Sequence, residues 1–544
     1  MEYGVLLHFL PRDCTGLRLW DGGAPQAQYH HRHFFFYGRH RAPSLPCVAS
    51  ASSFSDCQPV RLEQKRRVAS TRPEAAFPWG CDVESLESGQ ILQEWLSSQG
   101  LPPQKMELQR VEAGGRGLVA QRKLRKGERL LYVPSSLIIT TQSEWSSPKA
   151  GNVLQENGVP EWPQLASFLI SEASQGKNSP WSSYIAALPQ QPRSILQWTA
   201  LDVDTYLAGS SIKDRALECI KDVNYTYHDL QERIFSRYPE LFPSKIYSLE
   251  SIKWAFSILF SRLVRLPSAG QQLALVPWAD MLNHSTEVNA FLDVEASSKT
   301  VILELDRAYE KGEQVLISYG KRSNAELLLS YGFIPAGPNT NDFVEVEAEL
   351  DPRDEMFTAK LDALQAHGLS SPQRFPVKLT GLPMQLLAFA RLAVSTSMQT
   401  QYYSQMAIAA TEKGLASNKQ QWDFDLEDKI KAFQFILTIC EASISNLTRF
   451  LKGKEDLLGD DIIHRGTAAE IGRQPKAELA VALCNSERTI LYRAQHVLRM
   501  ELLELRAKKS GSRLGSKLNP PSFGPLEKIG NLFGVNSTRF EPCE

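Results

Sequence analysis

The sequence predicts an α+β fold in which a β-rich region contains a long helical insertion and is followed by an all-α C-terminal domain. Three observations predict this fold. Short strand-like runs punctuated by glycines occupy residues 106–140, and runs of the same style return at residues 272–335. The residues between them, about 145–270, show helical periodicity. Helical periodicity also covers nearly everything between about 350 and 510, so two β regions of one style indicate a single β domain with an insertion.

The N-terminal segment differs in composition from the rest of the chain. The first 80 residues contain ten Lys or Arg against six Asp or Glu, and residues 41–71 are rich in Ser, Arg and Ala. An acid-poor, Ser- and Arg-rich segment is typical of an organelle transit peptide. We therefore expect residues 1–84 to be a transit-peptide-like or disordered segment, the alternative being an N-terminus that is not coding sequence.

The folded part is expected to begin at residue 85 with a helix. The segment "SGQILQEWLSSQGL" has a helical stripe of apolar residues and stops at Gly100; the stripe is Ile91, Leu92, Trp95 and Leu96. Further helices are predicted for "WPQLASFLISEAS" and for "SLESIKWAFSILFSRLVRL", where "SLES" is a capping pattern. The predicted domains are a β domain at 85–340 with its insertion at about 145–270, a helical domain at 341–510 and a flexible tail at 511–544.

The overall composition excludes several classes of protein. Hydrophobic residues make up 42% and charged residues 22%, and the formal net charge is −1, so no global field favours nucleic acid. No run of 18 apolar residues predicts a membrane span. The eight cysteines form no CxxC pair, which indicates a reduced protein without a disulfide framework.

The glycine-rich segment "GRGLVA" at residues 115–120 fits the G-x-G-x-x-A pattern of dinucleotide-binding proteins. That pattern requires a helix to follow it, whereas a Lys126-Gly127-Glu128 turn and another strand follow here. The segment is therefore predicted to be a glycine-rich hairpin, in which glycines allow a ligand to approach the backbone closely.

Two further segments carry polar and aromatic side chains at the ends of elements. The segment "WADMLNHS" at 278–285 has no neighbouring ligand set for a metal and, taken alone, is more often a turn. The segment "GEQVLISYGKRSNAELLLSYGF" at 312–333 predicts a strand at 315–319 and then a helix ending at Tyr331. Two Tyr-Gly pairs lie 12 residues apart in it. A tyrosine at a strand end is often a core residue, but beside a glycine it can present its hydroxyl group.

Together and in this order, "GGRGLVAQRKLRKGE", "WADMLNHS" and "GEQVLISYGKRSNAELLLSYGF" resemble the SET-domain protein methyltransferases. The helical insertion, with "WSSYIAALP" and "KWAFSILFSR", and the helical C-terminal domain are similar to the plant Rubisco large-subunit lysine methyltransferase group. The resemblance covers about residues 88–510. It implies transfer of a methyl group from S-adenosylmethionine to a lysine of a non-histone protein, with no metal.

The resemblance also implies roles for individual residues. Asn283 and His284 would hold the cofactor, Arg262 would pair with its carboxylate, and the backbone of Gly115 and Arg116 would lie over it.

The same resemblance assigns Tyr319 to catalysis and to substrate binding, because its hydroxyl would orient the lysine amine. Tyr331 and Phe333 would form aromatic walls beside the cofactor, and Asp280 would lie on the substrate side. The helices from about 350 to 510 would present a groove to the protein substrate.

Several alternatives remain open on the sequence. The protein substrate is Rubisco, a plastid aldolase or another stromal protein, which places the chain in the chloroplast stroma, with the cytoplasm as the alternative. A related branch of the family methylates histidine. A different class of function is a catalytically weak interaction module that keeps the fold. The motif residues argue against such a module, because one released from catalysis need not keep Arg262, Asn283, His284 and Tyr319 together.

Overall fold

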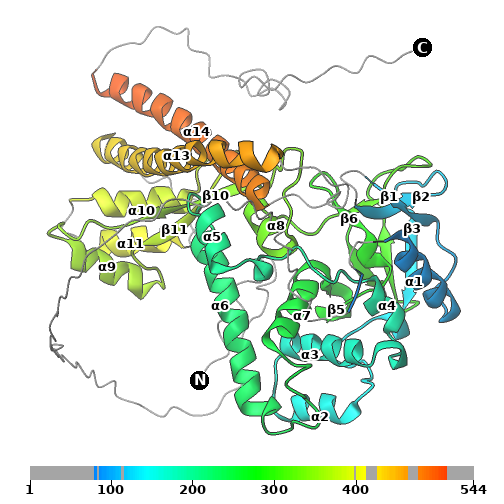
Figure 1. Cartoon of the computed structure of the whole chain (residues 1–544). Helices are drawn as coiled ribbons and strands as arrows, with labels where there is room; N and C mark the ends of the chain where they lie inside the picture. Colours follow the sequence, from blue (N-terminus) through cyan, green and yellow to red (C-terminus); the bar gives the residue numbers. More distant parts are fainter. Residues whose placement is uncertain are drawn as a thin grey trace, which may run out of the picture. The chain divides into compact units, whose positions relative to one another are not determined.

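The structure is a computed structural model that describes residues 79–81, 85–111, 115–396, 400–411, 426–463 and 476–510 (Figure 1). The predicted targeting segment lies almost entirely outside these residues, and the predicted tail at 511–544 lies wholly outside them. Residues 79–544 form one unit by their contacts. The predicted boundaries at 340/341 and 510/511 therefore stay predictions.

The predicted first helix and glycine-rich hairpin are both present. Helix α1 (Leu86–Ser98) begins where the Ser85 hydroxyl accepts a hydrogen bond from the Ser88 amide. Strands β1 (Met106–Arg110) and β2 (Arg116–Ala120) then pair antiparallel. A Cβ added at Gly89 of α1 would lie 2.1 Å from the Leu108 side chain, so α1 packs closely on this hairpin.

The β region is a single structure that the inserted helices interrupt. Strand β3 (Arg129–Pro134), before the insertion, pairs antiparallel with β8 (Thr300–Glu304), after it, and β8 also pairs with β7 (Leu292–Glu295). The chain thus returns to the same sheet, as the fold class predicts. Two shorter pairs complete the region: β4 (Val264–Leu266) with β5 (Gln272–Ala274), and β6 (Asn283–His284) with β9 (Leu316–Ile317).

The part of the insertion before β4 is helical throughout its regular elements. The two helices predicted from periodicity are α3 (Glu161–Ser174) and α7 (Leu249–Arg262), which pack against each other. Ser248 caps α7 by accepting from the Ser251 amide at 3.2 Å. The other α-helices of the insertion are α2 (Pro148–Glu156), α4 (Ser182–Ala187), α5 (Ala200–Tyr206) and α6 (Lys213–Leu230).

The C-terminal part is mainly helical, as predicted, with one addition. Strands β10 (Phe343–Ala348) and β11 (Gln373–Lys378) form an antiparallel pair in which Val344 and Val346 are buried. Alternating side chains in "FVEVEA" explain the strand, since successive residues face opposite sides. The helices are α8 (Asn324–Tyr331), which leads into this part, α9 (Phe357–Ala366), α10 (Met384–Val394), α11 (Thr400–Ala410), α13 (Leu426–Ile463) and α14 (Lys476–Lys509).

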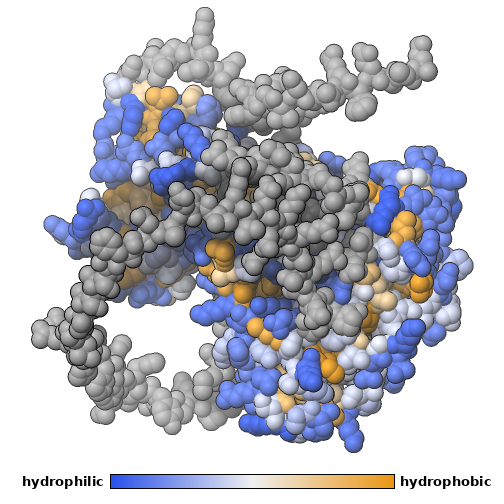
Figure 2. Space-filling view, in the orientation of Figure 1, coloured by the Kyte–Doolittle hydropathy of each residue, from blue (hydrophilic) through white to orange (hydrophobic). Residues whose placement is uncertain are grey.

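Helices α13 and α14 run side by side along the top of the view in Figure 1. Their shared core contains fully buried Phe389, Cys440 and Leu491. Hydrophilic residues cover most of the visible coloured surface, and hydrophobic ones form small patches (Figure 2). Within the described part of the chain, no helix combines the length and apolarity that a membrane crossing requires.

Candidate active site

The segment "WADMLNHS" leads into the short strand β6, which joins two distant parts of the chain. Trp278 has a positive φ of 74° and a fully buried ring, and it begins a tight helical turn at Ala279–Met281. Strand β6 then runs parallel to β9, with Asn283 opposite Leu316 and His284 opposite Ile317. Parallel pairing places the residues that follow both strands at the same end.

The side chain of Asn283 connects this strand to the glycine-rich hairpin. Its Nδ2 donates to the carbonyl oxygen of Arg116 at 3.0 Å. A Cβ at Gly117 would lie 2.8 Å from Asn283 Nδ2 and 2.4 Å from Gln314 Nε2. Only glycine permits this approach without displacing those side chains.

The two predicted residues of the glycine turn differ in their surroundings. The Arg116 side chain is 4% exposed, and it donates to the Ser85 carbonyl at 3.2 Å and to the Ala187 carbonyl at 2.5 Å. It therefore ties α1 and α4 to the hairpin. A Cβ added at Gly115 would meet no atom within 4 Å, so this backbone is open to approach. Binding of the cofactor by the backbone of Gly115 and Arg116 stays a prediction.

Four aromatic rings pack together at the end of β6 and β9. The rings of His284 and Tyr319 stack with centroids 5.1 Å apart and planes at 19°. Tyr331 stacks on the other side of Tyr319, at 4.6 Å and 18°. Phe333 meets both His284 and Tyr331 edge-on at 6.3 Å. The structure thus brings together four of the predicted site residues.

The polar groups of Tyr319 are fixed as firmly as its ring. Its hydroxyl donates to the Leu282 carbonyl oxygen at 2.7 Å, and its amide donates to His284 Nδ1 at 3.1 Å. The same Nδ1 lies 3.3 Å from the Ile317 carbonyl oxygen, so two backbone groups position the imidazole ring. Burial lowers the pKa of His284, which favours a neutral ring near pH 7.

Two other predicted residues, Arg262 and Asp280, form a buried ion pair. Arg262 Nε lies 3.5 Å from Asp280 Oδ2, with the side chains 12% and 2% exposed. The hydroxyl of Tyr184 donates to the same oxygen at 2.9 Å. Burial raises the pKa of Asp280, while the Arg262 charge opposes that shift. Arg262 and Asp280 were predicted to contact separate ligands, and no pattern in the sequence indicates their contact with each other.

Three residues that were not predicted as site residues also adjoin the site. They are Tyr184, whose segment "WSSYIAALP" was noted only for its resemblance, Gln314 beside Gly117, and Arg322. Arg322 Nε donates to the Tyr319 carbonyl at 2.9 Å, and its guanidinium lies 5.7 Å from the centre of the Tyr331 ring. No local pattern in the sequence distinguishes these residues from other polar residues. Among the described residues, no three His, Cys, Asp or Glu are grouped to hold a metal ion.

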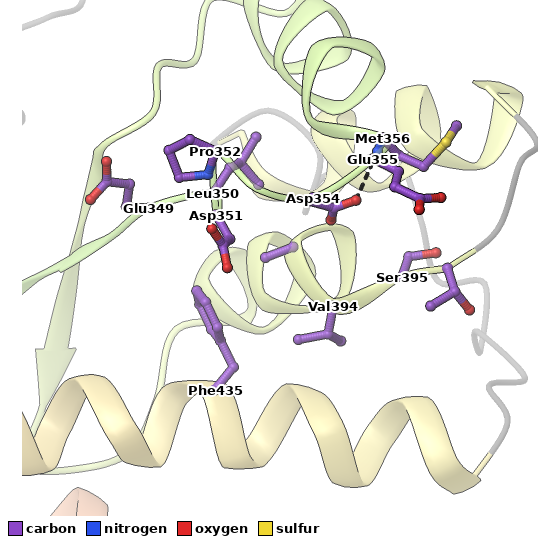
Figure 3. Close-up of a pocket in the computed structure, with 12 residues that line it drawn as sticks. Glu349, Leu350, Asp351, Pro352, Asp354, Glu355, Met356, Val394, Ser395 and Phe435 are labelled. Atoms are coloured by element: carbon purple, nitrogen blue, oxygen red, sulfur yellow. Dashed lines mark hydrogen bonds between the residues drawn. The ribbon is translucent and has the colours of Figure 1, made fainter.

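A separate cavity of about 660 Å³ lies in the C-terminal part, between the start of α9, the end of α10 and α13 (Figure 3). Asp351 and Phe435 point toward each other across it. Its carboxylates include Asp354, which pairs with buried Lys360, and Asp351, which pairs with Arg353. None of the predicted site residues lines this cavity.

The comparisons with known proteins agree with this arrangement. Residues 115–320 match the family described as SET domain, and residues 351–491 match the family described as Rubisco LSMT substrate-binding. A chloroplastic fructose-bisphosphate aldolase lysine N-methyltransferase of Arabidopsis thaliana is 31% identical over 361 residues, which cover 63% of this chain and 73% of that protein. This chain belongs to the SET-domain methyltransferases. The resemblance inferred from the sequence is confirmed.

Other relatives of this SET-domain methyltransferase include two kinds of enzyme. The Rubisco large subunit N-methyltransferase of Pisum sativum is 29% identical over 66% of this chain and 73% of its own length. The human actin-histidine N-methyltransferase is 25% identical over 63% of this chain and 59% of its own length. A solved structure of Rubisco LSMT bound to AdoMet shares the fold, with a TM-score of 0.59 and 22% identity over 82% of this chain and 99% of that one.

Proposed function

We propose that this SET-domain methyltransferase transfers a methyl group from S-adenosylmethionine to the side-chain amine of a lysine in a protein substrate. The observation that carries the proposal is the fixed Tyr319 hydroxyl, 2.7 Å from the Leu282 carbonyl oxygen, beside the strand that carries Asn283 and His284. A rigid pair of oxygens at the end of an aromatic stack suits the orientation of an amine.

The residues present fit the cofactor. The Arg262 guanidinium, held by Asp280, provides a cation for the methionine carboxylate. The Gly115 backbone, where an added Cβ would meet no atom within 4 Å, and the amide of Asn283 provide further polar groups. When bound, S-adenosylmethionine supplies an electrophilic methyl group on a positively charged sulfur.

The chain's own residues then orient the acceptor. The Tyr319 hydroxyl, which donates a hydrogen bond to the Leu282 carbonyl oxygen, would orient the incoming amine by accepting from its N–H groups. Tyr331 and Phe333 limit the space around that amine and exclude water, and aromatic faces also tolerate a cationic product. The lysine must be neutral to attack, and removal of its amine from water lowers its pKa toward neutrality.

The choice of protein substrate rests on the relatives. The Rubisco and aldolase methyltransferases are named as chloroplastic, and the acid-poor N-terminal segment has the composition of a transit peptide. We therefore propose the chloroplast stroma as the location and a stromal enzyme such as Rubisco or aldolase as the substrate. The matched substrate-binding region at 351–491 would hold that protein.

Methylation of a histidine is the second candidate. The actin-histidine N-methyltransferases among the relatives favour it. The two acceptors are distinguished by fragmenting the labelled product in a mass spectrometer, because a methylated imidazole and a methylated amine give different modified residues.

The test is to incubate the chain with labelled S-adenosylmethionine and a leaf stromal extract, and to search for methylated proteins. We expect label on a lysine of one or a few proteins. Absence of label together with absence of cofactor binding in calorimetry would contradict the enzyme assignment. Cofactor binding without label in any extract would support the interaction module instead.

A further inference from the structure

Helix α8 carries one wall of the candidate site at its C-terminal end and a buried polar cluster at its other end. It has eight residues, Asn324–Tyr331, and so extends about 12 Å. Tyr331 stacks on Tyr319, whereas Asn324 lies 5% exposed in contact with helix α14 of the C-terminal part. A displacement at one end of so short a helix is felt at the other.

The cluster at the start of α8 has three members, Asn324, Asp342 and Ser486. The amide of Asn324 donates to Asp342 Oδ1 at 2.8 Å, and its Nδ2 donates to Asp342 Oδ2 at 2.8 Å. The same Nδ2 donates to the Ser486 hydroxyl oxygen at 3.0 Å, and that hydroxyl donates to Asp342 Oδ2. Ser486 belongs to α14, so the cluster joins two regions 162 residues apart.

The groups of Asn324 are fully used within the protein. Its Oδ1 accepts from Asn339 Nδ2 at 3.0 Å. Asn339 Nδ2 also donates to the Arg322 carbonyl oxygen at 2.8 Å. Ser323, which precedes Asn324, forms a capping box with Glu326 that fixes the first turn of α8. Asn324 therefore acts on the protein and does not contact a ligand.

Burial of the Asp342 carboxyl group costs free energy, which indicates that the hydrogen bonds it accepts have a role in the protein. It is 6% exposed, and the hydrogen bonds it accepts come from neutral donors: two from Asn324, one from the Phe343 amide and one from Ser486. Burial raises the pKa of Asp342. A carboxylate at the N-terminus of a helix is favoured by the helix dipole, which partly offsets this cost.

The far end of α8 is also blocked against movement. Gly332 ends the helix in the left-handed conformation, with φ of 73°. A Cβ built there would lie 1.3 Å from the Arg193 carbonyl oxygen. The backbone of Arg193 at this end and the hydrogen bonds of Asn324 at the other end therefore fix the position of α8 together.

We propose that Asn324, Asp342 and Ser486 are positioning residues: they fix α8 against α14 and thereby hold Tyr331 against Tyr319. The inference rests on the proposed methyl transfer. It links the region that would bind the protein substrate to the geometry of the wall beside the acceptor amine.

The experiment is a double-mutant cycle on the full chain, using Asp342→Asn and Tyr331→Ala, with kcat, the KM for the methylated protein and the thermal midpoint measured. Asp342→Asn places two amide groups against each other and should lower kcat about tenfold while leaving KM within about twofold. In the Tyr331→Ala background the same change should lower kcat by less than about twofold, because it acts through Tyr331. Adding Asn324→Asp to Asp342→Asn exchanges the partners and should restore kcat.

Two further variants complete the design. Ser486→Ala removes one hydroxyl and is the milder test if Asp342→Asn does not fold, with a smaller loss of kcat in the same direction. Ser211→Ala is the matched control, because it removes a part-buried hydroxyl bond to Glu487 of the same helix without touching α8. It should leave kcat unchanged.

Equal losses of kcat with and without Tyr331, or an equal loss for Ser211→Ala, would overturn the positioning role and leave the proposed function intact. A wild-type chain that methylates no protein would overturn the proposed function itself.

Discussion

The Tyr319 side chain is held by contacts on every part of it. Its ring lies between His284 and Tyr331, its hydroxyl donates to Leu282, and its amide donates to the imidazole. Each contact fixes a different degree of freedom. The oxygen is therefore in place before any substrate arrives, which is the condition for orienting an amine without a cost in entropy.

Removing that oxygen should lower the rate of transfer and leave the fold intact. In Tyr319→Phe the ring still stacks, so we expect a loss of about 10- to 100-fold in kcat and of about 1 kcal/mol in the free energy of unfolding. Initial rates with labelled cofactor and a thermal scan measure the two effects. Tyr309→Phe is the matched control, because the Tyr309 hydroxyl also donates to a backbone carbonyl, that of Leu316, at 3.3 Å. A Tyr319→Phe enzyme as fast as wild type would remove Tyr319 from catalysis.

The glycine turn should act through cofactor affinity. In Gly117→Ala the new methyl group would push Asn283 Nδ2 and Gln314 Nε2 aside, since both lie within 2.8 Å of the added Cβ. Both are ends of flexible side chains, so we expect little change in stability but a roughly tenfold weaker affinity for S-adenosylmethionine. Calorimetry measures that affinity, with Gly337→Ala, which meets no atom within 4 Å, as the control. Equal affinities for the two variants would contradict a cofactor role for Asn283.

At this scale the sequence predicted some contacts and could not predict others. The grouping of Asn283, His284 and Tyr319 was predicted from the resemblance that three motifs in a recognisable order carry. The pairing of Arg262 with Asp280 follows from burial, because a carboxylate removed from water needs a compensating charge, and single-residue patterns do not encode burial.

Among the elements, α8 depends most on a single residue at its end. Gly332 is in the left-handed region and also abuts the backbone of Arg193, so any side chain there meets strain and a clash together.

The substitution Gly332→Ala should therefore destabilise the chain far more than the same substitution at Gly127. Gly127 has a similar φ of 77°, but a Cβ there meets nothing within 4 Å, so its cost should be only about 1 kcal/mol. For Gly332→Ala we expect a loss of more than about 4 kcal/mol or no soluble protein. Thermal unfolding of the two variants separates the cost of the clash, which only Gly332→Ala has, from the cost of backbone strain, which both variants share. Similar midpoints would show that the Arg193 backbone moves freely.

Helices were predicted better than strands for a physical reason. The helical periodicity of α3 and α7 lies within a continuous segment, and both helices form, although the pattern predicted the second through Leu266 and Val264–Leu266 is strand β4 instead. The strand predicted at 315–319 is shorter, Leu316–Ile317, because the Tyr319 amide bonds to the His284 ring instead of to a neighbouring strand. Strand β10 was missed because its "FVEVEA" alternation is only six residues long beside strong helical signals.

At the scale of the whole molecule, α14 ties the C-terminal part to the insertion through Glu487. This side chain is 2% exposed, and its Oε1 accepts from Ser210 at 2.8 Å and from Ser211 at 3.0 Å. Burial raises the pKa of Glu487 from 4.5 to about 7, although the two hydroxyl groups act in the opposite direction.

This shift predicts a pH dependence of stability with a definite sign. Between pH 4.5 and about 7 the folded chain binds a proton at Glu487 that the unfolded chain does not, so its contribution to stability is lost as the pH rises through 7. Glu487→Gln should therefore raise the free energy of unfolding at pH 8, by roughly 3 kcal/mol at most, and change it little at pH 4.5. Thermal scans from pH 4.5 to 8 measure the difference, with exposed Glu501→Gln as the control. A constant difference at all pH values would contradict the shift.

The hydrogen bond between Asn283 and the Arg116 carbonyl has a consequence for how the chain folds during its synthesis. It spans 167 residues, and the bond between Asn324 and Ser486 spans 162 more. Contacts so distant along the chain form slowly and only after both partners exist. A ribosome must therefore have made the chain beyond Ser486 before the whole arrangement can close. A shorter product that lacks α14 carries every residue assigned to the methyl transfer but lacks the anchor that holds Tyr331 in place.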